Sequence, residues 1–151
     1  MLPRDRCLLF ADDSADDRFF IKNACAEAGI TAAIAMVDDG DEVVKYVDGA
    51  GAYADRRAHP LPGLVVLDLK MTRMSGLETL EWIRRHPTRR CLPVLILSAS
   101  INPGDIRRAY ELGVCAFLAK PSTAQELTEL MRALKGFWLR FNEYPTDAGK
   151  P

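Results

Sequence analysis

The chain has 151 residues, a length that fits one domain whose single core needs neither metal nor disulfide support. Its net charge of −1, from 20 Lys and Arg against 21 Asp and Glu, argues against bulk attraction to DNA or to an anionic membrane. No apolar run is long enough for a signal peptide core or a membrane span. Four cysteines without paired spacing and only two histidines argue against a zinc site and favour a reducing, cytoplasmic setting.

Five short apolar runs recur along the chain, and longer segments of helical character separate them. Runs of four to six residues with little polar alternation are typical of strands that are buried on both faces. Cys7 and Cys115 lie inside such runs, where a reduced cysteine is expected to pack as a small hydrophobic group. The expected strands are Cys7–Ala11, Ala32–Val37, Leu64–Leu67, Pro93–Leu97 and Cys115–Ala119.

The segments between the runs carry helix signals. The first helix is expected to begin after Ser14, which can cap it, and to end at Gly29. Asp16 and Asp17 are interpreted as charges that favour its first turn. A long loop, Gly49–Gly63, is expected between the second helix and the third strand. The later helices open on capping patterns: Ser75 with Glu78, Asn102 with Pro103 at the first helical position, and Thr123 with Glu126.

Strand and helix alternate five times, which predicts an α/β fold with a doubly wound parallel sheet and helices on both faces. In such open sheets, the functional crevice lies beyond the carboxyl ends of the strands, where the strand order reverses. Polar residues directly follow the carboxyl ends of four of the five expected strands: Asp12 and Asp13, Asp68, Ser98, and Lys120. We therefore expect three carboxylates, a hydroxyl and an ammonium group to meet at one edge of the sheet.

Each of these groups has a task if the chemistry is phosphoryl transfer to a carboxylate. Three clustered carboxylates repel one another, and a hard divalent cation such as Mg²⁺ relieves that repulsion. A central carboxylate can accept a phosphoryl group. A lysine can pair with the resulting anion, and a hydroxyl can hydrogen-bond one of its oxygens.

The set Asp12-Asp13, Asp68, Ser98-Ala99 and Lys120-Pro121 resembles the receiver domain family of bacterial response regulators, over about residues 6–135. The resemblance implies a flavodoxin-like (CheY-like) fold with strand order 2-1-3-4-5 and five helices. It implies a two-component signalling protein that takes a phosphoryl group from a histidine kinase on Asp68. Slow self-dephosphorylation, rather than enzyme turnover, is expected.

The same resemblance assigns roles to the site residues. Asp13 and Asp68 would bind Mg²⁺ directly with the main-chain carbonyl of Lys70, and Asp12 would act through a bound water. Lys120 would contact the phosphoryl group, and its bond to Pro121 is expected to be cis. The switch residues would be Ser98, which moves toward the phosphate, and Phe117, which swings inward and changes the surface of the fourth helix, fifth strand and fifth helix.

The loop that follows the expected acceptor departs from the family pattern at two positions. Thr72 stands where the family often has proline, although Gly76 is retained, so the turn is expected to be looser. Lys70 is unusual beside the site, and we hypothesise that its ammonium alters how fast water reaches the phosphoaspartate.

The end of the last helix carries apolar groups on more than one face, among them Phe137, Trp138, Leu139 and Phe141. With the following Tyr144-Pro145, this pattern resembles the single-domain regulators that partner bacterial phytochromes. The resemblance implies a receiver domain over residues 1–141, a tail over residues 142–151, and a homodimer formed by the fourth helix, fifth strand, fifth helix and tail. Packing of the aromatic groups on the domain's own core is the alternative.

Other functions stay open. A phosphorelay intermediate would pass the phosphate on to a histidine phosphotransfer protein. An aspartyl-phosphate hydrolase usually carries D-x-D at its nucleophile, and Asp68-Leu69-Lys70 lacks the second acid. A flavin- or nucleotide-binding domain would need a phosphate-binding loop after the first strand, where the acidic residues 12–17 would instead repel a phosphate.

Overall fold

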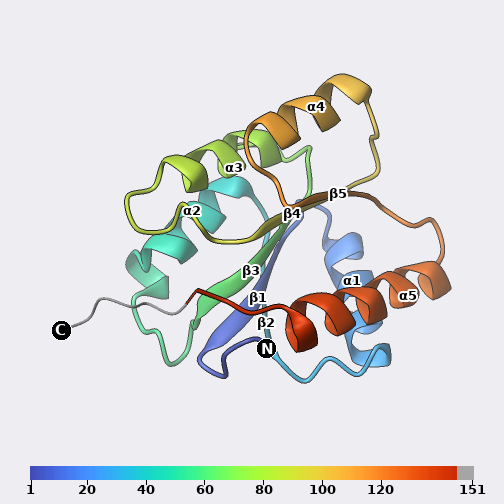
Figure 1. Ribbon diagram of the computed structural model, residues 1–151, viewed down its shortest axis with the longest axis horizontal. Coiled ribbons are helices and arrows are strands. Elements are labelled where there is room, and N and C mark those ends of the chain that lie inside the picture. Colours follow the sequence, from blue (N-terminus) through green and yellow to red (C-terminus); the bar gives the residue numbers. More distant parts are fainter. Residues whose placement is uncertain (146–151) are drawn as a thin grey trace.

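A five-stranded parallel sheet forms the centre of the protein, and helices cover both of its faces (Figure 1). The computed structural model describes residues 1–145. The strands lie in the order β2-β1-β3-β4-β5, as predicted, so the strand order reverses beside β1. Their bounds are β1 Arg6–Ala11, β2 Ala33–Val37, β3 Leu61–Leu67, β4 Val94–Ser98 and β5 Ala116–Ala119.

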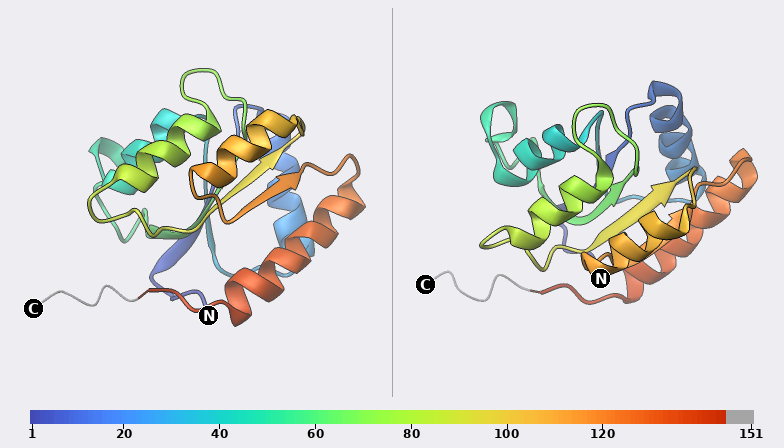
Figure 2. Two further views of the ribbon diagram at one scale, coloured as in Figure 1. Left: turned by 45° about the horizontal axis from the view of Figure 1, so that its top comes forward. Right: turned by 90° about the horizontal axis from the view of Figure 1, so that it is seen from above.

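Helices α1 and α5 pack together on one face, and α2, α3 and α4 cover the other (Figure 2). The predicted caps are confirmed: the side chains of Ser14, Ser75, Asn102 and Thr123 each accept a backbone N–H of the helix that follows. The helices are α1 Ala15–Glu27, α2 Gly40–Asp48, α3 Gly76–Arg85, α4 Pro103–Glu111 and α5 Ala124–Leu134.

The sheet separates two buried clusters of apolar side chains, as expected for strands that are covered on both sides. Along β1, Leu9 faces the cluster beneath α2, α3 and α4, whereas Leu8 and Phe10 face the cluster beneath α1 and α5. All three side chains are almost fully buried. The core therefore holds β1 in place between β2 and β3, and Asp12 directly follows its carboxyl end.

Besides shifts of one residue at the ends of the other strands, three details of the fold differ from the sequence prediction. Strand β3 begins at Leu61 rather than Leu64, and a 3₁₀ turn at Gly51–Tyr53 interrupts the expected loop. Pro62 fits inside the strand because the pairing with β1 shifts register there, so its missing N–H costs little. Cys115 precedes β5 and is exposed, so its predicted packing in the core is wrong, whereas Cys7 is buried.

Beyond α5, the chain continues as a π-helical segment, Lys135–Phe141. Trp138, Leu139 and Tyr144 pack against the cluster beneath α1 and α5, while Phe137 and Phe141 are 59% and 70% exposed. The predicted aromatic end thus divides between the domain's own core and the surface. Residues 146–151 of the predicted tail lie outside the described residues.

The two ends of the described chain meet at the amino-terminal edge of the sheet. The N–H of Leu2 donates to the carbonyl of Leu139 at 3.0 Å, and the Tyr144 hydroxyl donates to the carbonyl of Trp138 at 2.5 Å. Leu2 also packs against Gly63, where a β-carbon would collide with the leucine side chain. Within residues 1–145, no helix has the length and apolar character needed to cross a membrane.

Candidate functional site

Three carboxylates meet at the carboxyl ends of β1 and β3, which are neighbours in the sheet. Asp12, Asp13 and Asp68 each place one oxygen within 4.8 Å of the others. Asp12 is buried, Asp68 is half-buried and Asp13 is exposed. A set of hard oxygen donors of this kind, open to solvent on one side, fits a divalent cation that keeps part of its water shell.

The central carboxylate, Asp68, is held in a partly desolvated position. Burial raises the pKa of Asp68, the ammonium of Lys120 opposes that change, and the charges of Asp12 and Asp13 add to it. The three carboxylates therefore repel one another, and a cation bound at their solvent-exposed side would relieve this repulsion.

The backbone around Asp68 is fixed by close packing with the start of α3. The N–H of Gly76 donates to the carbonyl of Leu69 at 2.8 Å, and a β-carbon at position 76 would collide with the carbonyl of Asp68. Only glycine allows this approach, which explains why the turn needs Gly76 whatever residue stands at Thr72.

Lys120 reaches the carboxylates from the end of β5. Its ammonium donates to Asp12 at 2.7 Å and to Asp17 at 2.8 Å, and it lies 3.6 Å from Asp68 Oδ2. Burial alone would lower the pKa of Lys120, but the hydrogen bonds to Asp12 and Asp17 and the charge of Asp68 raise it. The lysine is therefore charged and faces Asp68.

The bond between Lys120 and Pro121 is trans, because no peptide bond among residues 1–145 is cis. The expectation of a cis bond is wrong for this structure. The trans isomer is the intrinsically favoured form even before proline, and the lysine reaches the carboxylates from it without difficulty.

Ser98 and Phe117, the two predicted switch residues, lie on β4 and β5, and neither makes a hydrogen bond to the three carboxylates. Ser98 is buried at the end of β4, beside the strand of Asp68, and its hydroxyl oxygen accepts the N–H of Ser100 at 3.1 Å. Phe117 is half-buried on β5 and packs against the apolar cluster beneath α2, α3 and α4. Their predicted movement toward a phosphate stays a prediction.

A buried aspartate at the start of α2 holds the loop that follows Asp68. Asp39 accepts the N–H groups of Gly40, Arg73 and Met74 at 2.7 to 3.0 Å. These bonds lower the pKa of Asp39, although burial alone would raise it. The guanidinium of Arg73 also pairs with Asp41 at 2.8 Å, so the loop is tied to α2 at several points.

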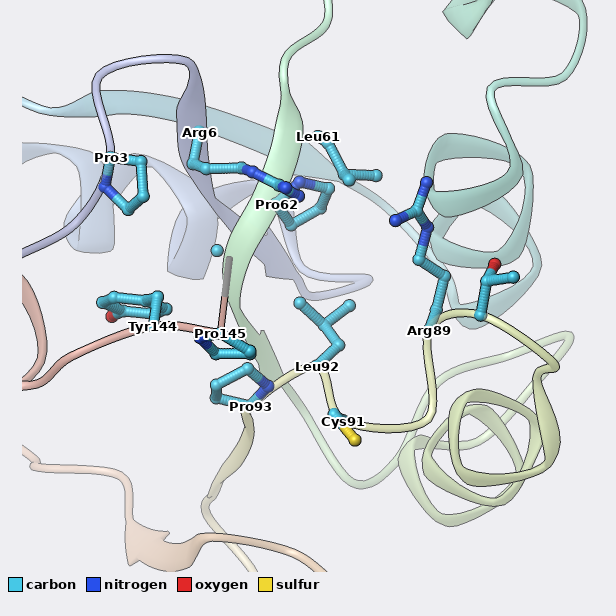
Figure 3. Close-up of a pocket in the computed structure, with 12 residues that line it drawn as sticks. Pro3, Arg6, Leu61, Pro62, Arg89, Cys91, Leu92, Pro93, Tyr144 and Pro145 are labelled. Carbon is cyan, nitrogen blue, oxygen red and sulfur yellow. The ribbon is translucent and has the colours of Figure 1, made fainter. Parts of the chain in front are cut away.

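A separate cavity of about 290 Å³ lies at the opposite edge of the sheet, where β1, β3 and β4 begin (Figure 3). Pro62, Pro93, Tyr144 and Pro145 line it together with Arg6 and Arg89. Because it opens at the amino ends of the strands, it is not part of the carboxylate cluster.

The model for the response regulator receiver domain family matches residues 8–132. This chain belongs to that family. The match covers most of β1, all of the other four strands, and the five residues that the sequence analysis placed at the strands' carboxyl ends: Asp12, Asp13, Asp68, Ser98 and Lys120.

Solved structures of other receivers resemble this one over nearly its whole length. The response regulator RPA3017 in red light signalling of R. palustris is 34% identical with a TM-score of 0.87. The phosphorylated cyanobacterial phytochrome response regulator RcpA is 30% identical with a TM-score of 0.83. The Mn²⁺-bound form of Rcp1, a response regulator of Synechocystis, is 26% identical with a TM-score of 0.82. Each alignment covers 93% of this chain and 99% of the other.

Two residues of this receiver contact the site although sequence reasoning did not place them there. Asp17, interpreted as a charge in the first turn of α1, bonds Lys120, and Asp39 ties down the loop after Asp68. Asp39 directly precedes α2, and an aspartate at that position is a typical helix cap. Nothing local predicts that either side chain reaches a residue far along the chain.

Proposed function

We propose that this receiver is a phosphorylation switch that takes a phosphoryl group from a histidine kinase on Asp68. The observation that carries the proposal is the position of Asp68, with Asp12 and Asp13 beside it and the Lys120 ammonium 3.6 Å from its Oδ2. In the transfer, a carboxylate oxygen of Asp68 forms a bond to phosphorus while the bond from phosphorus to the kinase's histidine nitrogen breaks. Lys120 neutralises negative charge on the transferred group.

Asp13 and Asp68, with the main-chain carbonyl of Lys70, would hold Mg²⁺ directly, and Asp12 would hold it through water. The cation would neutralise charge on the phosphoryl oxygens. The oxygen donors of this cluster and the Mn²⁺ bound by the similar regulator Rcp1 support a divalent cation here.

The output would be a changed surface on α4, β5 and α5. Ser98 would leave its bond to Ser100 to meet the phosphate, and Phe117 would turn into the space behind it. The exposed rings of Phe137 and Phe141, just beyond α5, support a homodimer through this surface and the tail. The resemblance to RPA3017 and RcpA supports a phytochrome kinase as the partner.

The first test is phosphorylation by phosphoramidate with Mg²⁺, followed by intact mass spectrometry of the wild type and of Asp68→Asn. We expect one added phosphoryl group on the wild type and none on the variant. Light scattering with and without beryllofluoride then shows whether the dimer changes. A wild type that gains no phosphate, or a variant that gains it equally, would overturn the assignment of Asp68.

The lifetime of the phosphoaspartate tests the role of Lys70 and distinguishes a signalling receiver from a hydrolase or a relay intermediate. The exposed Lys70 would change the approach of water, so Lys70→Asn should alter the rate at which the phosphate is lost. Slow loss in the absence of partners fits a signalling receiver and not a hydrolase. Rapid loss only when a histidine phosphotransfer protein is added would identify a relay intermediate.

A further inference from the structure

We infer that Asp17 is a positioning residue that holds the Lys120 ammonium beside the acceptor, an inference that rests on the proposed function of Asp68. Lys120 has three N–H donors. Two of them are engaged by Asp12 at 2.7 Å and by Asp17 at 2.8 Å, from the end of β1 and the first turn of α1. The ammonium is thereby fixed at 3.6 Å from Asp68 Oδ2 before any phosphate arrives.

The two anchors differ in what else they do. Asp12 belongs to the carboxylate cluster, where a cation would compete with the lysine for its oxygens. Asp17 lies outside that cluster and, among the described residues, its carboxylate bonds Lys120 alone. Asp17 is therefore the anchor that stays available to the lysine when a cation engages Asp12.

A cavity beside the lysine shows where the ammonium could otherwise go. This cavity of about 260 Å³ lies between α1 and the start of α5, and Asp17, Phe20, Lys120 and Thr123 line it. A lysine side chain is long and loses considerable rotamer freedom when it is fixed. Without Asp17, the ammonium would be free to turn into this space and toward solvent, and phosphoryl transfer would have to order it again.

The first turn of α1 provides a matched control. The helix cap uses the backbone N–H of residue 17, which donates to Ser14 Oγ, so Asp17→Asn leaves the cap in place. Asp16 carries the same charge in the same turn but is exposed and makes no hydrogen bond or ion pair with residues 1–145. Asp16→Asn therefore changes the net charge of the protein and the charge at the start of α1 by the same amount as Asp17→Asn does. It leaves the contacts of Lys120 unchanged.

The anchoring itself can be measured without phosphorylation. The wild type, Asp17→Asn and Asp16→Asn are treated briefly with an amine-acylating reagent, and modification of Lys120 is followed by peptide mass spectrometry. We expect Lys120 to be acylated about three- to tenfold faster in Asp17→Asn and unchanged in Asp16→Asn. Equal rates in all three proteins would overturn the inference.

The consequence for the reaction is tested with phosphoramidate and Mg²⁺. We expect Asp17→Asn to be phosphorylated about three- to tenfold more slowly than the wild type, and Asp16→Asn at the wild-type rate. In a Lys120→Ala background, Asp17→Asn should cause no further loss, because Asp17 acts through the lysine. A loss of the same size in that background would show a merely structural role and overturn the inference.

The two proposals fail in different ways. A wild type that takes no phosphate, combined with faster acylation of Lys120 in Asp17→Asn, would overturn the proposed function and leave the anchor standing. Normal phosphorylation of the wild type and of Asp17→Asn would leave the proposed function intact and overturn the role of Asp17.

Discussion

The Thr72 hydroxyl donates a hydrogen bond to Asp13 Oδ2 across 3.2 Å, and so links the loop after β3 to the loop after β1. Thr72 occupies the position where the family often has proline, which could not donate this bond. The bond orients an exposed carboxylate that we propose as a cation ligand. It also offsets the looser turn that the sequence predicts at this position.

Replacing Thr72 with valine should therefore weaken Mg²⁺ binding. Loss of one solvent-exposed hydrogen bond corresponds to about a two- to fivefold lower affinity. Isothermal titration of the wild type and the variant measures this, and Thr72→Ser, which keeps the hydroxyl, should bind as the wild type does. A valine variant with unchanged affinity would show that Asp13 needs no such support.

The repulsion among the carboxylates predicts that Asp68→Asn is more stable than the wild type in the absence of divalent cations. Because burial raises the pKa of Asp68 above its ordinary 3.8, the folded state holds this proton more tightly than the unfolded chain. The stability that Asp68 contributes therefore falls as the pH rises above about 4, and at pH 7 its charge is a cost. We expect the variant to gain roughly 1 kcal/mol at pH 7.

Urea denaturation followed by circular dichroism at pH 7 and below pH 4 checks this expectation. The gain should shrink at the lower pH, where Asp68 is protonated in both states, and Mg²⁺ should stabilise the wild type more than the variant. Asp16→Asn serves as the control for a simple loss of charge. A variant less stable than the wild type under all these conditions would contradict the repulsion.

Removal of the Asp39 carboxylate should destabilise the protein and loosen the loop after Asp68. Asp39→Ala would leave three backbone N–H groups, those of Gly40, Arg73 and Met74, without their acceptor. Because Asp39 is only 1% exposed, we expect a loss of about 2–4 kcal/mol in urea denaturation. Asp39→Asn keeps one acceptor oxygen and should lose less; equal losses would show that the charge, and not the geometry, matters.

The four cysteines should divide into two classes of reactivity. At pH 8, Cys91 and Cys115, which are exposed, should be alkylated quickly, whereas Cys7 and Cys25 are buried and should react only after unfolding. Mass spectrometry of the alkylated peptides gives both rates. Protection of Cys115 equal to that of Cys25 would contradict its exposed position.

Burial also makes Cys25 sensitive to alkaline pH. It raises the pKa of the Cys25 thiol from 9.0 to about 11, so the folded state keeps a proton that the unfolded chain releases. The contribution of this thiol to stability is therefore complete below pH 9 and is lost as the pH rises to about 11. Unfolding measured across this range should show the slope in the wild type and less of it in Cys25→Ala.

Local sequence signals predicted most of the fold because they are satisfied within a few residues. Caps such as Ser14 and Ser75 bond the helix that they begin, and each buried strand is an apolar run. The start of β3 was missed because Pro62 and Gly63 are typical of loops. Their place in the strand depends on the register of β1, and Gly63 falls where that register shifts.

The carboxylate cluster could be predicted because parallel strands bring their carboxyl ends to one edge whatever else the chain does. The contact of Asp17 with Lys120 could not, because it depends on how α1 lies against the end of β5, which is 103 residues away in the sequence. The position of Asp39 beneath the loop after Asp68 is likewise a tertiary property. The sequence thus did not predict the contacts by which Asp17 and Asp39 support the surroundings of Asp68.

The bond between Leu2 and Leu139 has a consequence for synthesis on the ribosome. Leu2 precedes all five strands in the chain, whereas its backbone partner follows all five strands and α5, so the bond cannot form until those elements have been made. Until then, the Leu2 side chain lacks the neighbouring Tyr144, and the start of β1 stays uncovered at this edge. This edge of the domain therefore closes late, after α5 has been made, and a chain stopped before residue 139 would leave the edge open.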